Sequence, residues 1–176
     1  NDKILIAGDQ ILSHITPSVM VPSAQPEANP MQEYLDSLVR LEALPADTLV
    51  LPSHGLPFRV LHQRLTQLRA YHLAMLDDVA SVITGRTTAF AVAQEVFPRA
   101  LYDNPRQAFG ESLAHLNMLA SIGRLARDVS TTGAISASRI CRGVAPVPIR
   151  PRMASDISDT GFTSTKARSQ PGMVEG

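Results

Sequence analysis

Residues 47–55 read Asp-Thr-Leu-Val-Leu-Pro-Ser-His-Gly, an apolar run closed by a proline and a polar turn. A short apolar run between turn residues is typical of a strand buried inside a sheet. A second such run, Lys-Ile-Leu-Ile-Ala, covers residues 3–7 and ends at Gly8-Asp9. We therefore expect two buried strands, each followed at once by a polar residue beside a glycine.

Helical signals occupy the stretch between these runs and much of the chain after the second run. Asn29 can cap a helix that begins with Pro30 at its first position, and Pro45 ends that helix. The order strand, loop, helix, strand is that of an α/β unit in which one crossover helix joins neighbouring strands. Apolar spacing predicts four helices in all, at about residues 30–44, 59–83, 88–97 and 105–122. The last two, with the Gly-Arg-Leu-Ala-Arg sequence after them, resemble a small winged-helix-like unit.

The composition excludes several classes of protein. Among 176 residues, Lys plus Arg and Asp plus Glu both number 16, which gives no electrostatic case for nucleic acid or an anionic membrane. No apolar run approaches the roughly 20 residues of a spanning helix, so we expect no membrane association. The single cysteine, Cys141, fits a reducing compartment, and we expect a cytoplasmic protein. Because the first residue is Asn1, we expect the natural start to lie upstream.

The last quarter of the chain has a different character. Ser, Thr, Pro, Gly and Arg dominate from Val129 onward, and the large apolar residues have no period. Such a segment buries too little surface to offset its ordering entropy. We expect residues 129–176 to be disordered or loosely attached.

Asp9 and His54 are the two residues that suggest chemistry. Each follows the end of an expected strand, and ligands of α/β sheets gather outside the carboxyl ends of strands. Imidazole and carboxylate together suit a first-row metal such as Zn²⁺. The plain alternative is an aspartate that caps a turn and a histidine in a polar loop.

Other polar residues receive structural interpretations. We expect His72, on the apolar face of the long helix, to be a hydrogen-bonded core histidine, and His115 to be structural as well. Ser53 has no evident base partner, so a serine nucleophile is not expected. The arginines of the long helix are expected to form a solvated face; they are Arg59, Arg64 and Arg69.

Two motifs resemble late motifs of the metallo-β-lactamase superfamily, nearest in style to its glyoxalase-II-like bacterial branch. They are residues 7–12, Ala-Gly-Asp-Gln-Ile-Leu, with Ile-Thr-Pro at 15–17, and residues 49–58, Leu-Val-Leu-Pro-Ser-His-Gly-Leu-Pro-Phe. The resemblance covers about residues 1–127. It implies that Asp9 bridges two metals, that His54 is the last metal-binding histidine, and that the later helices form the branch's C-terminal extension.

The resemblance implies a fold and a domain division. The expected class is α/β (α+β), with the C-terminal part of an αββα sandwich at residues 1–58. A helical, winged-helix-like region is expected at 59–128, before the tail at 129–176. The family's main motif, His-x-His-x-Asp-His, is missing from the chain, which we therefore expect to be a fragment with no catalytic residue of its own.

The implied activity is metal-dependent hydrolysis of an ester, thioester, lactone or related acyl bond in a full-length parent. Two Zn²⁺ ions are the expected cofactors, with iron or manganese as alternatives, and Asp9 and His54 are the expected metal ligands. A small molecule is the expected substrate, and the formation of a homo-oligomer is left as an alternative. The rival hypotheses are a non-catalytic module that binds a partner or nucleic acid, and a nuclease of the same superfamily.

Overall fold

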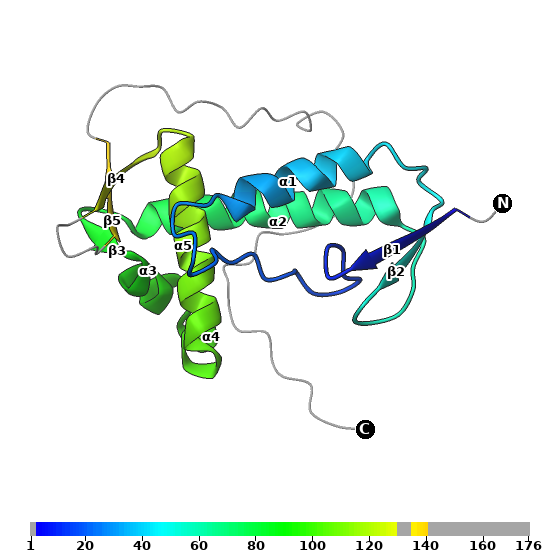
Figure 1. The fold of residues 1–176 in the computed structure, drawn as a ribbon, viewed down its shortest axis with the longest axis horizontal. Helices are drawn as coiled ribbons and strands as arrows, with labels where there is room; N and C mark the ends of the chain where they lie inside the picture. The colour runs from blue at the N-terminus through cyan, green and yellow to red at the C-terminus, as the bar shows by residue number, and fades with distance from the viewer. Residues whose placement is uncertain (1–2, 130–134, 141–176) are drawn as a thin grey trace.

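The computed structural model describes residues 3–129 and 135–140. Strand β1 (Ile4–Gly8), helix α1 (Pro30–Leu41) and strand β2 (Leu49–Pro52) form the first unit. β1 pairs with β2 in parallel, with Ile4 opposite Leu49 and Gly8 opposite Pro52. The predicted strand-helix-strand unit is confirmed, and its two strands are direct neighbours (Figure 1).

Helix starts follow the local signals of the sequence. The Asn29 side chain accepts a hydrogen bond of 3.2 Å from the backbone N–H of Gln32, and Pro30 occupies the first turn of α1. Asn104 caps α5 (Pro105–Ser121) in the same way, through the N–H of Gln107. These side chains satisfy backbone donors that the helix itself leaves unpaired.

Helix α2 (Leu61–Val82) is the central element of the fold. It lies alongside α1 and is crossed by α5 (Figure 1). One face carries the largest fully buried side chains of the helix, which are Leu61, Leu65, Leu68, Leu76 and Val79. Truncating a buried leucine of this kind costs roughly 2–5 kcal/mol, so this face contributes much of the stability.

A winged-helix-like unit lies at the opposite end of α2 from β1 and β2 (Figure 1). Its helices are α3 (Ala89–Val96), α4 (Pro98–Asp103) and α5. Its antiparallel sheet has the order β3-β5-β4, built from β3 (Thr87–Thr88), β4 (Leu125–Val129) and β5 (Ile135–Arg139). Gly123, at φ +73°, ends α5 and turns the chain into β4, as the sequence predicts for a C-terminal cap.

The expected start of the disordered tail is wrong for part of that stretch. β5 pairs with β4 over five residue pairs, from Leu125 opposite Arg139 to Val129 opposite Ile135. Residues 135–139 are therefore part of the sheet. The expectation for residues 141–176, including Cys141, lies outside the described residues.

Some residues expected in the core are exposed. Ile4 and Ile6 of β1 are 54% and 83% exposed, so one face of this strand is uncovered, although its sequence predicts burial. Strands of parallel sheets are normally covered on both faces. Elsewhere in the fold, Phe90 of α3 and Phe109 of α5 are about half exposed. In the part of the chain that the structure describes, no helix has both the length and the apolar character to cross a bilayer.

Candidate metal centre

Asp9 and His54 lie against each other at the carboxyl ends of β1 and β2. Because the strands are parallel neighbours, the residues that follow them emerge at the same edge of the sheet. The backbone N–H of Ser53 donates to the carbonyl of Gly8 at 3.0 Å, which extends the pairing to the start of both turns. His54 Nδ1 then lies 2.8 Å from Asp9 Oδ1. The structure thus brings together the two residues that the sequence places just past the ends of the two strands.

The contacts of Asp9 determine how the pair is held together. A carboxylate accepts hydrogen bonds, so His54 Nδ1 is the donor to Asp9, and Nε2 is the ring nitrogen outside this contact. Ser53 Oγ donates to the same Asp9 oxygen. Hydrogen bonds from Ser53 and then His54 hold the pKa of the Asp9 carboxyl below its ordinary value of 3.8. The pair therefore presents a carboxylate that ionises readily, beside an imidazole ring that it orients through Nδ1.

Ser53 does lie beside a base, which the sequence did not suggest, yet the arrangement is no catalytic triad. In a triad the histidine uses one ring nitrogen for the carboxylate and the other for the serine. Here Ser53 Oγ lies 3.1 Å from His54 Nδ1, the nitrogen that already contacts Asp9. Nothing in this geometry draws the proton from the serine towards Nε2.

The donor types of the pair fit a divalent metal, but their number is too small. A catalytic zinc has three protein ligands and a water. Within residues 3–129 and 135–140, no group of three His, Cys, Asp or Glu side chains is arranged to hold a metal ion. The side chains of His54 and Asp9 are 68% and 64% exposed, so both are open to donors from elsewhere. The described residues thus offer two donors of suitable type, fewer than a metal ion requires.

Helix α1 holds the turn that carries Asp9. Tyr34 Oη donates to the carbonyl of Gln10 at 3.3 Å, and the Gln10 side chain bonds Ser37 Oγ. Burial raises the pKa of Tyr34 to about 12, so its hydroxyl stays a donor at neutral pH. Residue 10 is therefore fixed from the same helix that connects the two strands.

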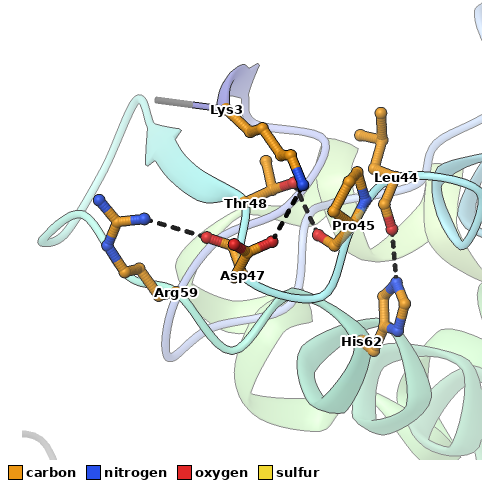
Figure 2. A network of polar contacts seen from close by, with 7 residues as sticks. All are labelled: Lys3, Leu44, Pro45, Asp47, Thr48, Arg59 and His62. Carbon is orange, nitrogen blue, oxygen red and sulfur yellow. Dashed lines mark hydrogen bonds and ion pairs between the residues drawn. The ribbon is translucent and has the colours of Figure 1, made fainter. Parts of the chain in front are cut away.

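A separate polar network lies at the opposite end of the strands (Figure 2). Lys3 Nζ lies 3.7 Å from Asp47 Oδ1, and Arg59 Nη1 donates to the Asp47 carbonyl at 3.0 Å. His62 Nε2 contacts the carbonyl of Leu44 at 2.7 Å. These residues precede β1 and β2 or start α2, so the network fixes the strand starts and has no part in the metal site.

His72 and His115 form a buried pair between α2 and α5. Each is only 3% exposed, and their ring centroids are 6.5 Å apart. His115 Nδ1 donates to the carbonyl of Glu111 at 2.7 Å, whereas His115 Nε2 and both nitrogens of His72 have no partner among the residues that the structure describes. The expected core position of His72 is confirmed, but the expected hydrogen bond is missing. The pair lines a cavity of about 20 Å³, enough for one water molecule.

Helix α5 of the winged-helix-like unit has little exposed surface with which to contact a nucleic acid. Ten of the 17 residues of α5 are buried. Two arginines outside α5 are engaged with carboxylates: Arg124 with Asp77 at 2.6 Å, and Arg86 with Asp128. This packing leaves less than half of α5 open to contact a nucleic acid.

Gly55 allows the turn after His54 to approach the turn after Asp9, and its replacement should be costly. Gly55 has φ +86°, and a Cβ there would lie 2.6 Å from Ser13 Oγ. We expect Gly55→Ala to lower the free energy of unfolding by about 1–2 kcal/mol, because an L-residue is strained in this region. Chemical denaturation measures the change. Gly85→Ala is the control, since its Cβ would meet nothing within 4 Å; an equal cost for both variants would contradict the argument.

Comparisons with known proteins point to one superfamily. Residues 76–139 match the family described as "Metallo-beta-lactamase-like, C-terminal domain". No curated protein sequence matches the chain.

Two solved structures share the fold. A beta-lactamase domain protein from Burkholderia ambifaria is 42% identical, with a TM-score of 0.71. A metallo-beta-lactamase family protein from Thermus thermophilus is 32% identical, with a TM-score of 0.66. Each match covers 78% of this chain and 42% of the other, so the chain spans less than half the length of either protein. The described residues therefore have the fold of the C-terminal part of a metallo-β-lactamase-like protein, which is mixed α/β and ends in a winged-helix-like unit.

Proposed function

We propose that the chain supplies part of the metal centre of a metal-dependent hydrolase. The observation that carries this proposal is the Asp9–His54 pair, joined through His54 Nδ1, at the carboxyl ends of two parallel strands. The likeness to metallo-β-lactamase-like proteins supports it. Asp9 would contribute a carboxylate oxygen, and His54 would contribute Nε2.

The remaining metal ligands would come from a segment of the parent protein that lies outside this chain. The chain spans 42% of the length of the two solved relatives, and the exposed side chains of Ile4 and Ile6 provide an apolar face for further structure. We place the missing His-x-His-x-Asp-His motif in that segment. Two Zn²⁺ ions, or iron or manganese in their place, would lower the pKa of a bound water and polarise the scissile bond.

The proposed substrates are small molecules with an ester, thioester, lactone or related acyl bond, as in the glyoxalase-II-like branch. The balanced charge of the chain and the buried α5 helix favour such a substrate over a phosphodiester in RNA. We place the parent enzyme in the cytoplasm, because the chain has a single cysteine.

A comparison of the chain with a longer protein tests the proposal. We expect the purified chain to bind Zn²⁺ weakly and to hydrolyse no thioester or lactone, because two donors leave most of the metal shell to water. A longer protein that contains the upstream motif should carry about two metals, by analogy with the superfamily, and should turn over one of these substrates. Metal analysis and a hydrolysis panel with added zinc or manganese are the measurements. Robust turnover by the chain alone would contradict the missing-ligand argument.

A further inference from the structure

We infer that Arg64 of α2 is a positioning residue that holds the two turns carrying Asp9 and His54 in register for metal binding. The effect on metal binding rests on the proposed function. The effect on the structure of the two turns rests only on the contacts of Arg64. The sequence predicts that Arg64 belongs to a solvated helix face. The structure corrects this: its side chain is half-buried and turned towards the segment after Asp9.

Arg64 holds that segment through two backbone carbonyls. Its Nε donates to the carbonyl of Leu12 at 2.6 Å, and its Nη2 donates to the carbonyl of Ile15 at 2.7 Å. Nη1 contacts Gln67 at 3.3 Å, one turn further along α2. The two carbonyl contacts enclose Ser13 and His14, so the guanidinium fixes the shape of the whole 12–15 turn.

The turn at residues 12–15 also packs against the turn that carries His54. Ser13 Oγ lies 2.6 Å from the point where a Cβ of Gly55 would stand, so the two turns approach each other closely beside His54. The Asp9 turn is therefore tied to α1 through Gln10 and to α2 through Arg64. Arg64 acts on both members of the pair, on Asp9 through the connected chain and on His54 through Ser13 and Gly55.

An arginine is required for this task because its planar guanidinium carries several donors in a fixed fork. A lysine keeps the charge but offers a single ammonium on a flexible stem, so it cannot hold two carbonyls in one geometry. Arg64→Lys therefore separates the geometric role from a role of charge alone. Arg59→Gln is a matched control on the same stretch of chain, because Arg59 also donates to a backbone carbonyl, at the far end of the strands (Figure 2).

Hydrogen exchange and zinc titration of the 176-residue chain test the inference. The amides of Gln10 and Ser53 report on the two turns, since they bond the carbonyls of Ala7 and Gly8. The amides of Thr48 and Leu49 report on the far end. In Arg64→Gln and Arg64→Lys, we expect exchange of the first two amides to rise at least tenfold while the last two stay unchanged. Arg59→Gln should show the reverse pattern.

Zinc binding supplies the second readout, and it is monitored through the NMR resonances of the His54 imidazole. We expect Arg64→Gln and Arg64→Lys to weaken zinc affinity roughly tenfold or more, as is usual when a residue that orients a metal ligand is lost. Uniformly faster exchange across the chain, or unchanged exchange of Gln10 and Ser53, would overturn the positioning role. If zinc leaves His54 unaffected in the wild-type chain, the proposed metal role of the pair fails, and the exchange pattern alone decides the role of Arg64.

Discussion

Acidification should destabilise the fold through the buried histidine pair. Burial, and then the neighbouring His115, lower the pKa of His72 from 6.5 to about 4. Burial also lowers the pKa of His115, against the opposing effect of its bond to the Glu111 carbonyl. As the pH falls, the unfolded chain therefore binds protons at these histidines before the folded chain does. We expect the free energy of unfolding to fall by about 3 kcal/mol from His72 alone as the pH drops from about 6.5 to 4.

The direction of this pH dependence follows from the depressed pKa of the folded state. Above about pH 6.5 both states hold His72 neutral, so its contribution to stability is constant. Below that pH the unfolded state binds a proton first, and stability declines until the folded pKa is reached. The groups around His72 are two tyrosines, His115 and Glu111, and a protonated pair would place two positive charges in one buried cavity.

Urea denaturation at several pH values measures this effect. His72→Leu should remove much of the slope between pH 6.5 and 4, because leucine binds no proton. Leu68→Ala is the control, since it should destabilise the fold by roughly 2–5 kcal/mol at every pH without changing the slope. An unchanged slope in His72→Leu would show that other groups cause the acid sensitivity.

The sequence predicts the first half of the fold well because its signals are local. Asn29-Pro30 marks the start of α1, and the two apolar runs are short enough to be strands. Local signals of this kind do not predict the antiparallel sheet. β4 and β5 read Leu-Ala-Arg-Asp-Val and Ile-Ser-Ala-Ser-Arg, with few apolar residues. These strands pair with each other, and β5 also pairs with β3, which is distant in the chain, so neither strand is marked by a local signal.

The sequence predicts only those residues of the candidate site whose place in the chain, directly after a strand, determines their location. Asp9 and His54 can be found because each follows a strand, and parallel neighbours bring their ends together. Arg64 cannot be found in this way, because a guanidinium that bonds backbone carbonyls requires no particular residue types at Leu12 and Ile15. Likewise, the sequence places His72 on the apolar face of α2 but gives no sign that His115 lies beside it.

Removing the Asp9 carboxylate should have the largest effect on the proposed reaction. In a longer protein with the complete metal centre, we expect Asp9→Ala to lower kcat/KM by more than a hundredfold. Loss of a residue that merely orients a ligand costs roughly 10–100-fold, and Asp9 is proposed to be a ligand itself. The same substitution removes the hydrogen-bond acceptor that fixes the tautomer of His54, so the second ligand is affected too.

Ser53→Ala provides the control for Asp9→Ala because it keeps both proposed ligands. Ser53 only donates to Asp9, so its loss should change the rate by far less while the Asp9–His54 contact remains. Both side chains are exposed, and neither substitution opens a cavity in the core, so the two variants should unfold at similar temperatures. Rates, metal content and melting temperatures of the three proteins decide the matter. Full activity of Asp9→Ala with two metals bound would remove Asp9 from the metal centre, whereas loss of metal together with activity would place it there.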